Sequence, residues 1–141
     1  MLDITKTRDA HIDERLRSDI MIWFNTVRAD GRPHSAAVWF LWDGETFLIF
    51  SRPHTQKVRN LRQNTNVLLA LDDTKNGSDV IQVEGKAELL DNNNEVSATL
   101  PAFAEKYGPL FKQMGLSAEA MAADYSQAIR ITPTKILGPV E

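Results

Sequence analysis

The side chains best suited to chemistry in this sequence lie where one apolar segment ends and a helix is expected to begin. Ser51 supplies a hydroxyl, and Lys57 and Arg59 supply cations beside the expected helix start. Together with the unpaired N–H groups of such a start, these groups suit a phosphate-like anion. A simpler interpretation is also open, in which the cations lie on a solvated helix face and Ser51 ends a strand. Residues 51–59 are therefore a candidate anion site.

Other kinds of reactive centre have little support. Cysteine is absent, which excludes disulfides, thiolate zinc sites and cysteine nucleophiles. His11, His34 and His54 are widely spaced, so we expect no metal site. The sequence has no P-loop, no G-x-G-x-x-G and no G-x-S-x-G motif. The catalytic residues are therefore unknown at this point, and an enzyme of this sequence would take its difficult chemistry from a cofactor.

Composition is that of an ordinary globular chain. Of 141 residues, 43% are apolar and 25% are charged, so we expect one domain, residues 1–141. The formal net charge of −3 argues against a general nucleic-acid partner. The longest uncharged apolar run, Ala36–Trp42, is far below the roughly 20 residues of a membrane helix, and the N-terminus lacks an apolar leader. We expect a soluble, cytoplasmic protein without a membrane partner.

Periodicity and turn residues predict a mainly β, α+β fold. The expected strands are Ile20–Arg28, Ser35–Trp42, Thr46–Phe50, Asn66–Asp72, Asp79–Leu90 and Ala128–Thr132. The expected helices are Asp9–Arg17, Thr55–Gln63, Asn92–Tyr107 and Ser117–Tyr125. Turns at Asp30–Pro33 and Asp43-Gly44 predict that the first three strands form an antiparallel meander. Six or so antiparallel strands would close, or nearly close, into a barrel with peripheral helices.

Particular residues refine this outline. The apolar run Asn66–Asp72 predicts a strand that is buried on both faces. Gly85 predicts a β-bulge within its strand. Gly108-Pro109 is expected to end one helix, and Pro133 to end the last strand.

Several segments together carry a family resemblance. They are TVRADGRPHSAAVWFLWDGE (Thr26–Glu45), SRPHTQKVRNLRQNTNVLLALDD (Ser51–Asp73), VIQVEGKAEL (Val80–Leu89) and the closing segment AIRITPTKI (Ala128–Ile136). The order of V-W-F and then K-x-R-N-L resembles the flavin-binding split β-barrel superfamily, which includes pyridoxamine 5′-phosphate oxidases. Within that superfamily the chain is most similar to the class of oxidoreductases that depend on the deazaflavin coenzyme F420. The resemblance covers most of the chain.

The resemblance implies a function and a set of contacts. It implies a split barrel that forms a homodimer, with F420 bound at the subunit interface. It implies hydride transfer from reduced F420 to an electron-poor conjugated small molecule. The cofactor-binding residues that it implies are Ala37, Val38 and Trp39 beside the ring, and Ser51, Arg52, Gln56, Lys57 and Arg59 around the phosphate and the tail.

Two departures from the family pattern matter. The arginine-rich R-x-V-L-L-K segment of true pyridoxamine phosphate oxidases is absent, and the matching strand reads Ala36–Leu41. We therefore do not expect oxidation of pyridoxamine phosphate. Asn64-Thr65 also replaces the usual Asn-Pro, which removes a rigid turn but no ligand group.

Alternatives to an F420 enzyme stay open. An FMN-binding oxidoreductase of the same fold needs only Ser51, Lys57 and Arg59 for its phosphate. A non-catalytic flavin, F420 or haem-binding protein is a second alternative, and a plain interaction module with Trp39 in a dimer interface is a third. The substrate wall is expected from the segment Pro101–Tyr125, which offers Phe103, Tyr107, Phe111, Met114 and Met121, although helical core packing explains these residues equally.

Overall fold

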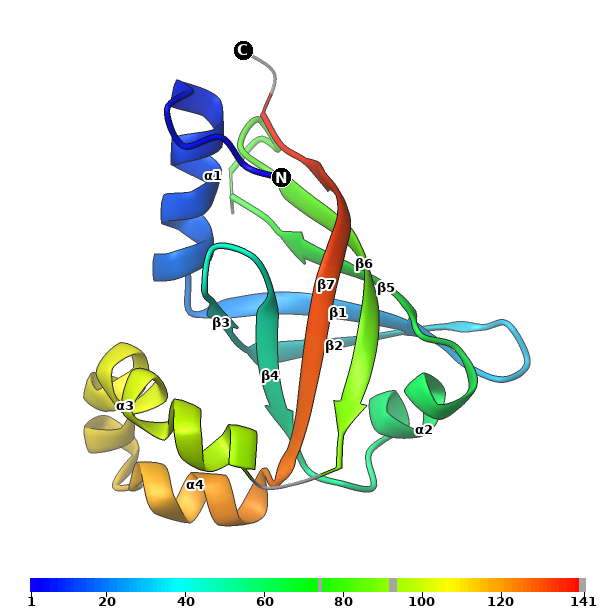
Figure 1. The fold of residues 1–141 in the computed structure, drawn as a ribbon, viewed down its shortest axis with the longest axis vertical. Coiled ribbons are helices and arrows are strands. Elements are labelled where there is room, and N and C mark those ends of the chain that lie inside the picture. Colours follow the sequence, from blue (N-terminus) through cyan, green and yellow to red (C-terminus); the bar gives the residue numbers. More distant parts are fainter. Residues whose placement is uncertain (74, 92–93, 140–141) are drawn as a thin grey trace.

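The protein is a curled antiparallel sheet with helices around it (Figure 1). The computed structural model describes residues 1–73, 75–91 and 94–139. The strands are β1 (Met21–Val27), β2 (Pro33–Trp39), β3 (Leu41–Trp42), β4 (Phe47–Ser51), β5 (Asn66–Leu71), β6 (Ile81–Leu90) and β7 (Gln127–Leu137). The helices are α1 (Thr7–Ser18), α2 (Gln56–Gln63), α3 (Asn94–Met114) and α4 (Ala118–Asp124). Helices α3 and α4 pack together beside β4 at one end of the sheet. Helix α2 lies at the same end of the sheet, on the opposite side of the strands from α3 and α4.

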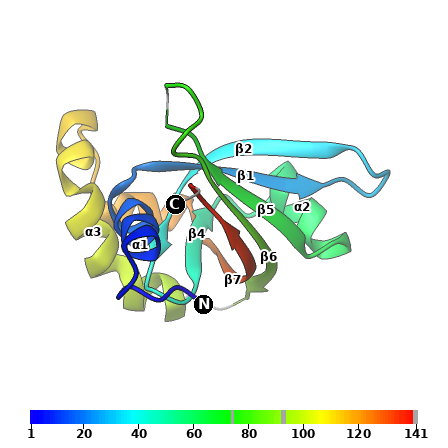
Figure 2. The same ribbon diagram turned by 90° about the horizontal axis from the view of Figure 1, so that it is seen from above.

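The order of the strands forces the sheet to curl. Neighbours run β2-β1-β5-β6-β7-β4-β3, so β2 and β3 are the two edges of the sheet. In a flat sheet these edges would lie roughly 29 Å apart, at about 4.8 Å per strand. Only Phe40 separates β2 from β3 along the chain, so Trp39 and Leu41 are two residue steps, at most about 7 Å, apart. The sheet must therefore turn back on itself, as Figure 2 shows.

This architecture confirms the predicted α+β split barrel, but it overturns the predicted meander. β1 and β2 do form an antiparallel hairpin, with Met21 opposite Trp39. The expected strand Ser35–Trp42 instead breaks at Phe40, and β4 pairs with β3 and β7. The turns were predicted correctly from local residues. The second partner of β4 is β7, which lies about 80 residues further along the chain, and no local signal indicates it.

Two apolar clusters hold the fold together. The first fills the barrel and includes Phe24, Phe40, Phe47 and Leu69, with α1 closing one end through its buried apolar residues. The second lies between β4 and α3 and includes Phe50. All five residues of β4 are buried because its two faces point into these two clusters.

Three expectations about individual elements are wrong for tertiary reasons. β5 is not buried on both faces, because its residues alternate between buried and partly exposed. Helix α3 continues through Gly108 and Pro109, since Phe103 and Phe111, on either side of that point, are both buried in the second apolar cluster. The predicted start of this helix, Asn92, lies outside the described residues.

The third wrong expectation concerns the end of the last strand. β7 passes through Pro133 to Leu137. Pro133 lies opposite Gly85, where the register of β6 and β7 shifts. The missing N–H of Pro133 therefore falls at an irregular point of the ladder, where it does little harm. The shift also confirms the bulge predicted at Gly85.

No helix in residues 1–73, 75–91 and 94–139 is long and apolar enough to cross a membrane.

The bulge gives a direct test of the sheet register. A Cβ at Gly85 would lie 2.8 Å from the backbone oxygen of Thr132, whereas a Cβ at Gly108 would meet nothing within 4 Å. We therefore expect Gly85→Ala to lower the free energy of unfolding by about 1–3 kcal/mol. Gly108→Ala, in the interior of α3, should leave it unchanged or raise it by up to ~1 kcal/mol. Urea unfolding of both variants checks this, and equal midpoints would contradict the bulge geometry.

Candidate functional site

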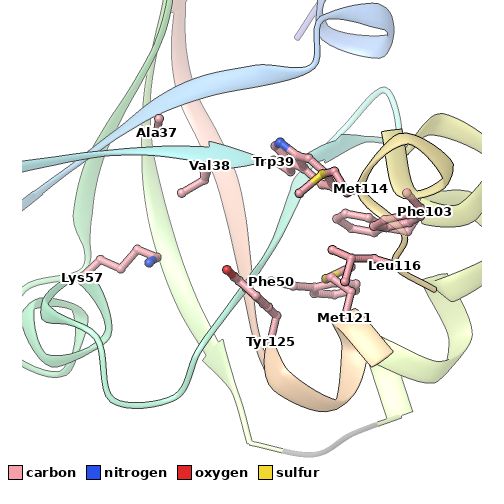
Figure 3. A pocket seen from close by; sticks show the side chains of 11 residues that line it. Ala37, Val38, Trp39, Phe50, Lys57, Phe103, Met114, Leu116, Met121 and Tyr125 are labelled. Atoms are coloured by element: carbon pink, nitrogen blue, oxygen red, sulfur yellow. The ribbon is translucent and has the colours of Figure 1, made fainter. Parts of the chain in front are cut away.

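A cavity of about 300 Å³ opens between β2, the end of β4 and the three helices α2, α3 and α4 (Figure 3). Ala37, Val38 and Trp39 form its strand side. The opposite side is apolar and consists of Phe50, Phe103, Phe111, Met114, Leu116, Met121 and Tyr125. Lys57 extends from α2 into the same space and is its single charged lining residue among the described residues.

The strand side of the cavity is an edge. β2 pairs with β1 alone, so the backbone N–H and C=O groups on its other side have no strand partner within the described sheet. Such groups can hydrogen-bond the polar edge of a ligand, while Trp39 offers it an apolar face. The cavity therefore suits a planar ring with one polar edge.

Lys57 brings a cation into this apolar space. Its side chain is partly buried, and burial lowers its pKa, with a further decrease from the nearby charge of Arg52. No carboxylate forms an ion pair with Lys57 in the described part of the chain. A partly buried ammonium without a counterion is unfavourable, and an anionic ligand group would compensate it.

A chain of amide hydrogen bonds sets the position of α2, and with it Lys57. The buried Asn60 donates from Nδ2 to Thr26 Oγ1 of β1 at 2.9 Å, and Gln56 Nε2 donates to Asn60 Oδ1 at 2.7 Å. Arg59 donates to Gln56 Oε1 and to the carbonyl of His54, each at 2.7 Å. Gln56 and Arg59 thus brace the helix and do not line the cavity. Asn60 was missed in the sequence, although a polar residue between the buried Val58 and Leu61 is the signal of such an anchor.

The remaining predicted residues shape the turn before α2. The Ser51 hydroxyl is buried, donates to the Arg52 carbonyl at 2.8 Å and lies 3.1 Å from Thr55 Oγ1. Arg52 is exposed, pairs with Asp124 at 2.9 Å and lies over the Tyr125 ring at 5.1 Å. The structure therefore brings Ala37, Val38, Trp39 and Lys57 together at the cavity. It places Ser51, Arg52, Gln56 and Arg59 around the start of α2, and their contact with a cofactor stays a prediction.

His34 is a second polar group near Lys57 that the sequence did not mark for ligand binding. Its Nδ1 atom is buried and has no hydrogen-bond partner among the described residues. Burial lowers the pKa of His34, and the charges of Arg28 and Lys57 lower it further. The imidazole therefore favours its neutral form, which leaves the positive charge in this region to the two cations. The described residues contain no cluster of three or more metal-ligating side chains.

The helical side of the cavity matches the sequence expectation in part. Phe103, Phe111, Met114 and Met121 line the cavity as expected for a substrate wall. Tyr107 does not, because it is fully buried behind Trp39. Phe50, Leu116 and Tyr125 also contribute, and they could be found only once β4 and α4 were placed beside α3.

The sequence matches a known protein family. The sequence profile of the pyridoxamine 5′-phosphate oxidase family matches residues 9–138. The chain belongs to the pyridoxamine 5′-phosphate oxidase family. It has the split-barrel fold of this superfamily, in which flavins are bound. The family therefore agrees with the resemblance found in the strand and helix motifs.

Solved structures show the same fold. A protein named as an F420 reductase is 25% identical, with a TM-score of 0.69, and the match covers 89% of this chain and 94% of that one. A conserved hypothetical protein of Mycobacterium tuberculosis is 23% identical, with a TM-score of 0.75 over 93% and 83% of the two chains. The haem storage protein HutZ of Vibrio cholerae is 18% identical, with a TM-score of 0.69 over 92% of each chain. No curated protein matches the sequence.

Proposed function

We propose that this member of the pyridoxamine 5′-phosphate oxidase family is an F420-dependent oxidoreductase. The observation that carries the proposal is the partly buried Lys57, which has no ion-pair partner among the described residues and lines an apolar cavity beside the edge strand β2. A deazaflavin presents a flat apolar ring, a polar ring edge and an anionic tail, so these residues fit it. The similarity to a protein named as an F420 reductase supports this choice of cofactor.

Each part of the site then has a task. The free edge of β2 at Ala37–Trp39 hydrogen-bonds the polar edge of the ring, and the Trp39 indole contacts its apolar part. Lys57 neutralises the phosphate of the cofactor. Arg52, exposed and close to Lys57, lies where the anionic tail leaves the cavity.

The chemistry proposed for the site needs few side chains. Reduced F420 supplies the hydride, and an electron-poor conjugated small molecule accepts it, with a proton from solvent completing the reduction. The apolar residues of α3 and α4 hold the substrate against the ring and exclude water from it. This division of labour agrees with the lining of the cavity, where Lys57 is the single charged side chain among the described residues.

FMN is the second candidate cofactor. FMN is favoured by the single cation at the cavity. Lys57 alone among the described cations lines the cavity, and one cation suffices for one phosphate. The non-catalytic haem alternative has less support in this cavity, because no described histidine lines it to bind the iron. The similarity to HutZ, at 18% identity, concerns the fold.

We also propose that the protein is a homodimer with the cofactor at the subunit interface. The outward face of β1 exposes apolar side chains, with Met21 38% and Trp23 39% exposed, and Ile20 is 40% exposed beside them. Met114 and Leu116 at the cavity rim are also exposed. Neighbouring exposed apolar residues of this size are typical of an interface.

The choice of cofactor is tested by titrating the purified protein in parallel with F420 and FMN while following ligand fluorescence. We expect tighter binding of F420, and turnover of reduced F420 with enone or quinone acceptors. Tighter binding of FMN would move the protein to the FMN alternative, and binding of neither would reject both.

Lys57→Met tests the anion site within the same titration. Loss of a charge-assisted contact should weaken binding of the preferred cofactor about tenfold or more. The fold should persist, because the substitution also removes a partly buried charge. Lys135→Met, which removes an exposed cation from β7, is the matched control and should bind normally. Equal affinity of the two variants would reject the role of Lys57.

The dimer is tested by sedimentation velocity. We expect the protein to sediment as a dimer and Trp23→Glu to shift it toward the monomer, because a carboxylate would be buried without a partner. Thr132→Glu places the same charge on an exposed position of β7 and should leave the dimer intact. A monomeric wild-type protein, or a Trp23→Glu dimer, would contradict the proposed interface.

A further inference from the structure

The chain crosses from one edge of the sheet to the other at Phe40, and one hydroxyl group secures this crossing. Phe40 belongs to neither β2 nor β3, so the strand ladders do not pair its backbone groups. The Tyr107 hydroxyl of α3 accepts the Phe40 N–H at 2.9 Å. The same oxygen lies 2.7 Å from the carbonyl oxygen of Ile20, just before β1, and 3.0 Å from that of Phe40. Tyr107 therefore links the start of β1, the crossing and α3.

Lys106 completes the set of donors. Its ammonium donates to the Phe40 carbonyl at 2.9 Å and lies 3.9 Å from the centre of the Phe40 ring. Because Lys106 satisfies that carbonyl, the single proton of Tyr107 is available to Ile20. Burial lowers the pKa of Lys106 to about 8, so the amine is still protonated at neutral pH. Each polar group at the crossing thus has a partner.

The ring of Tyr107 packs against Trp39, a residue that lines the cavity. Trp39, the residue before the crossing, lines the cavity, and its indole stacks on Tyr107 with centroids 4.4 Å apart and planes at 2°. Phe111, one helical turn further along α3, packs against the same indole at 5.7 Å. Tyr107 is fully buried, so it does not touch a ligand in the cavity. It fixes the backbone next to Trp39 through its hydroxyl and the indole through its ring.

We propose that Tyr107 is a positioning residue that holds Trp39 as a fixed wall of the cavity. Its effect on ligand binding rests on the proposed function, whereas its effect on the indole does not. Through this contact α3 controls the shape of a cavity wall that comes from β2. Tyr107→Phe separates the two contributions, because it keeps the stacked ring and removes the hydroxyl.

The experiment uses the full chain labelled with 5-fluorotryptophan and observed by fluorine NMR. The chain has three tryptophans, so the Trp39 signal can be assigned from its loss in Trp39→Phe. We expect Tyr107→Phe to shift or broaden the Trp39 signal and leave that of Trp42, which lies in the barrel cluster. We also expect about tenfold weaker binding of the preferred flavin or deazaflavin.

Two further variants keep the result interpretable. Val83→Ala, inside the barrel, removes core packing away from the cavity and should leave both the Trp39 signal and ligand affinity unchanged in the folded protein. Lys106→Met loosens the same crossing with the Tyr107 hydroxyl in place, and a smaller shift of the Trp39 signal is expected. If Tyr107→Phe does not fold, the wild-type protein decides the question, because a Phe40 N–H that is bonded to the Tyr107 hydroxyl should exchange slowly with deuterium.

The outcomes are distinct. An unmoved Trp39 signal in Tyr107→Phe or, where that variant does not fold, rapid exchange of the wild-type Phe40 amide would overturn the proposal. A moved signal with unchanged affinity would overturn its binding part. A wild-type protein that binds neither F420 nor FMN would reject the proposed function, and the Trp39 signal would still decide the role of Tyr107.

Discussion

The structure depends on one constraint, which is that the two edge strands of its sheet are consecutive in the chain. Because Phe40 alone joins β2 to β3, the sheet must curl until its edges meet. Where the two edges meet, one side of β2 has no strand partner and lies beside β4 and α3. The cavity lies at this meeting of the two edges. The barrel and the candidate site are therefore two consequences of one topological feature.

Electrostatics and packing divide the work within the cavity. The helices α3 and α4 supply an apolar wall, and α2 supplies one partly buried cation. The position of that cation is fixed indirectly, since Asn60 binds Thr26 and so docks the whole helix on β1. A ligand with a planar apolar part and an anionic part would use both features. The flavins and deazaflavins of the pyridoxamine 5′-phosphate oxidase family have this character.

Local signals in the sequence predicted local structure well. The hairpin between β1 and β2, the bulge at Gly85 and the short helix α2 follow from turn residues and periodicity. Long-range packing explains the failures. Pro133 and Gly108-Pro109 were expected to end elements, yet a matching bulge and a continuous apolar face accommodate them. The meander failed because no local signal shows that β4 pairs with β7.

The candidate site was predictable to a similar degree. The motif resemblance led to Ala37–Trp39 and Lys57, which the fold brings to one cavity. It did not reveal that Arg59 and Gln56 bind each other on α2, because adjacent cations and amides in a sequence carry no information on side-chain direction. Nor did it separate Tyr107 from the lining residues, since burial behind Trp39 depends on how α3 meets the crossing.

The most direct test of the central claim is the amide NMR spectrum of the protein with and without F420. If the ring lies on the free edge of β2 and the phosphate on α2, the largest shifts will occur at Ala37, Val38, Trp39 and Lys57. Shifts confined to α1 and to Asp79, at the other end of the barrel, with those four residues unmoved, would contradict the account.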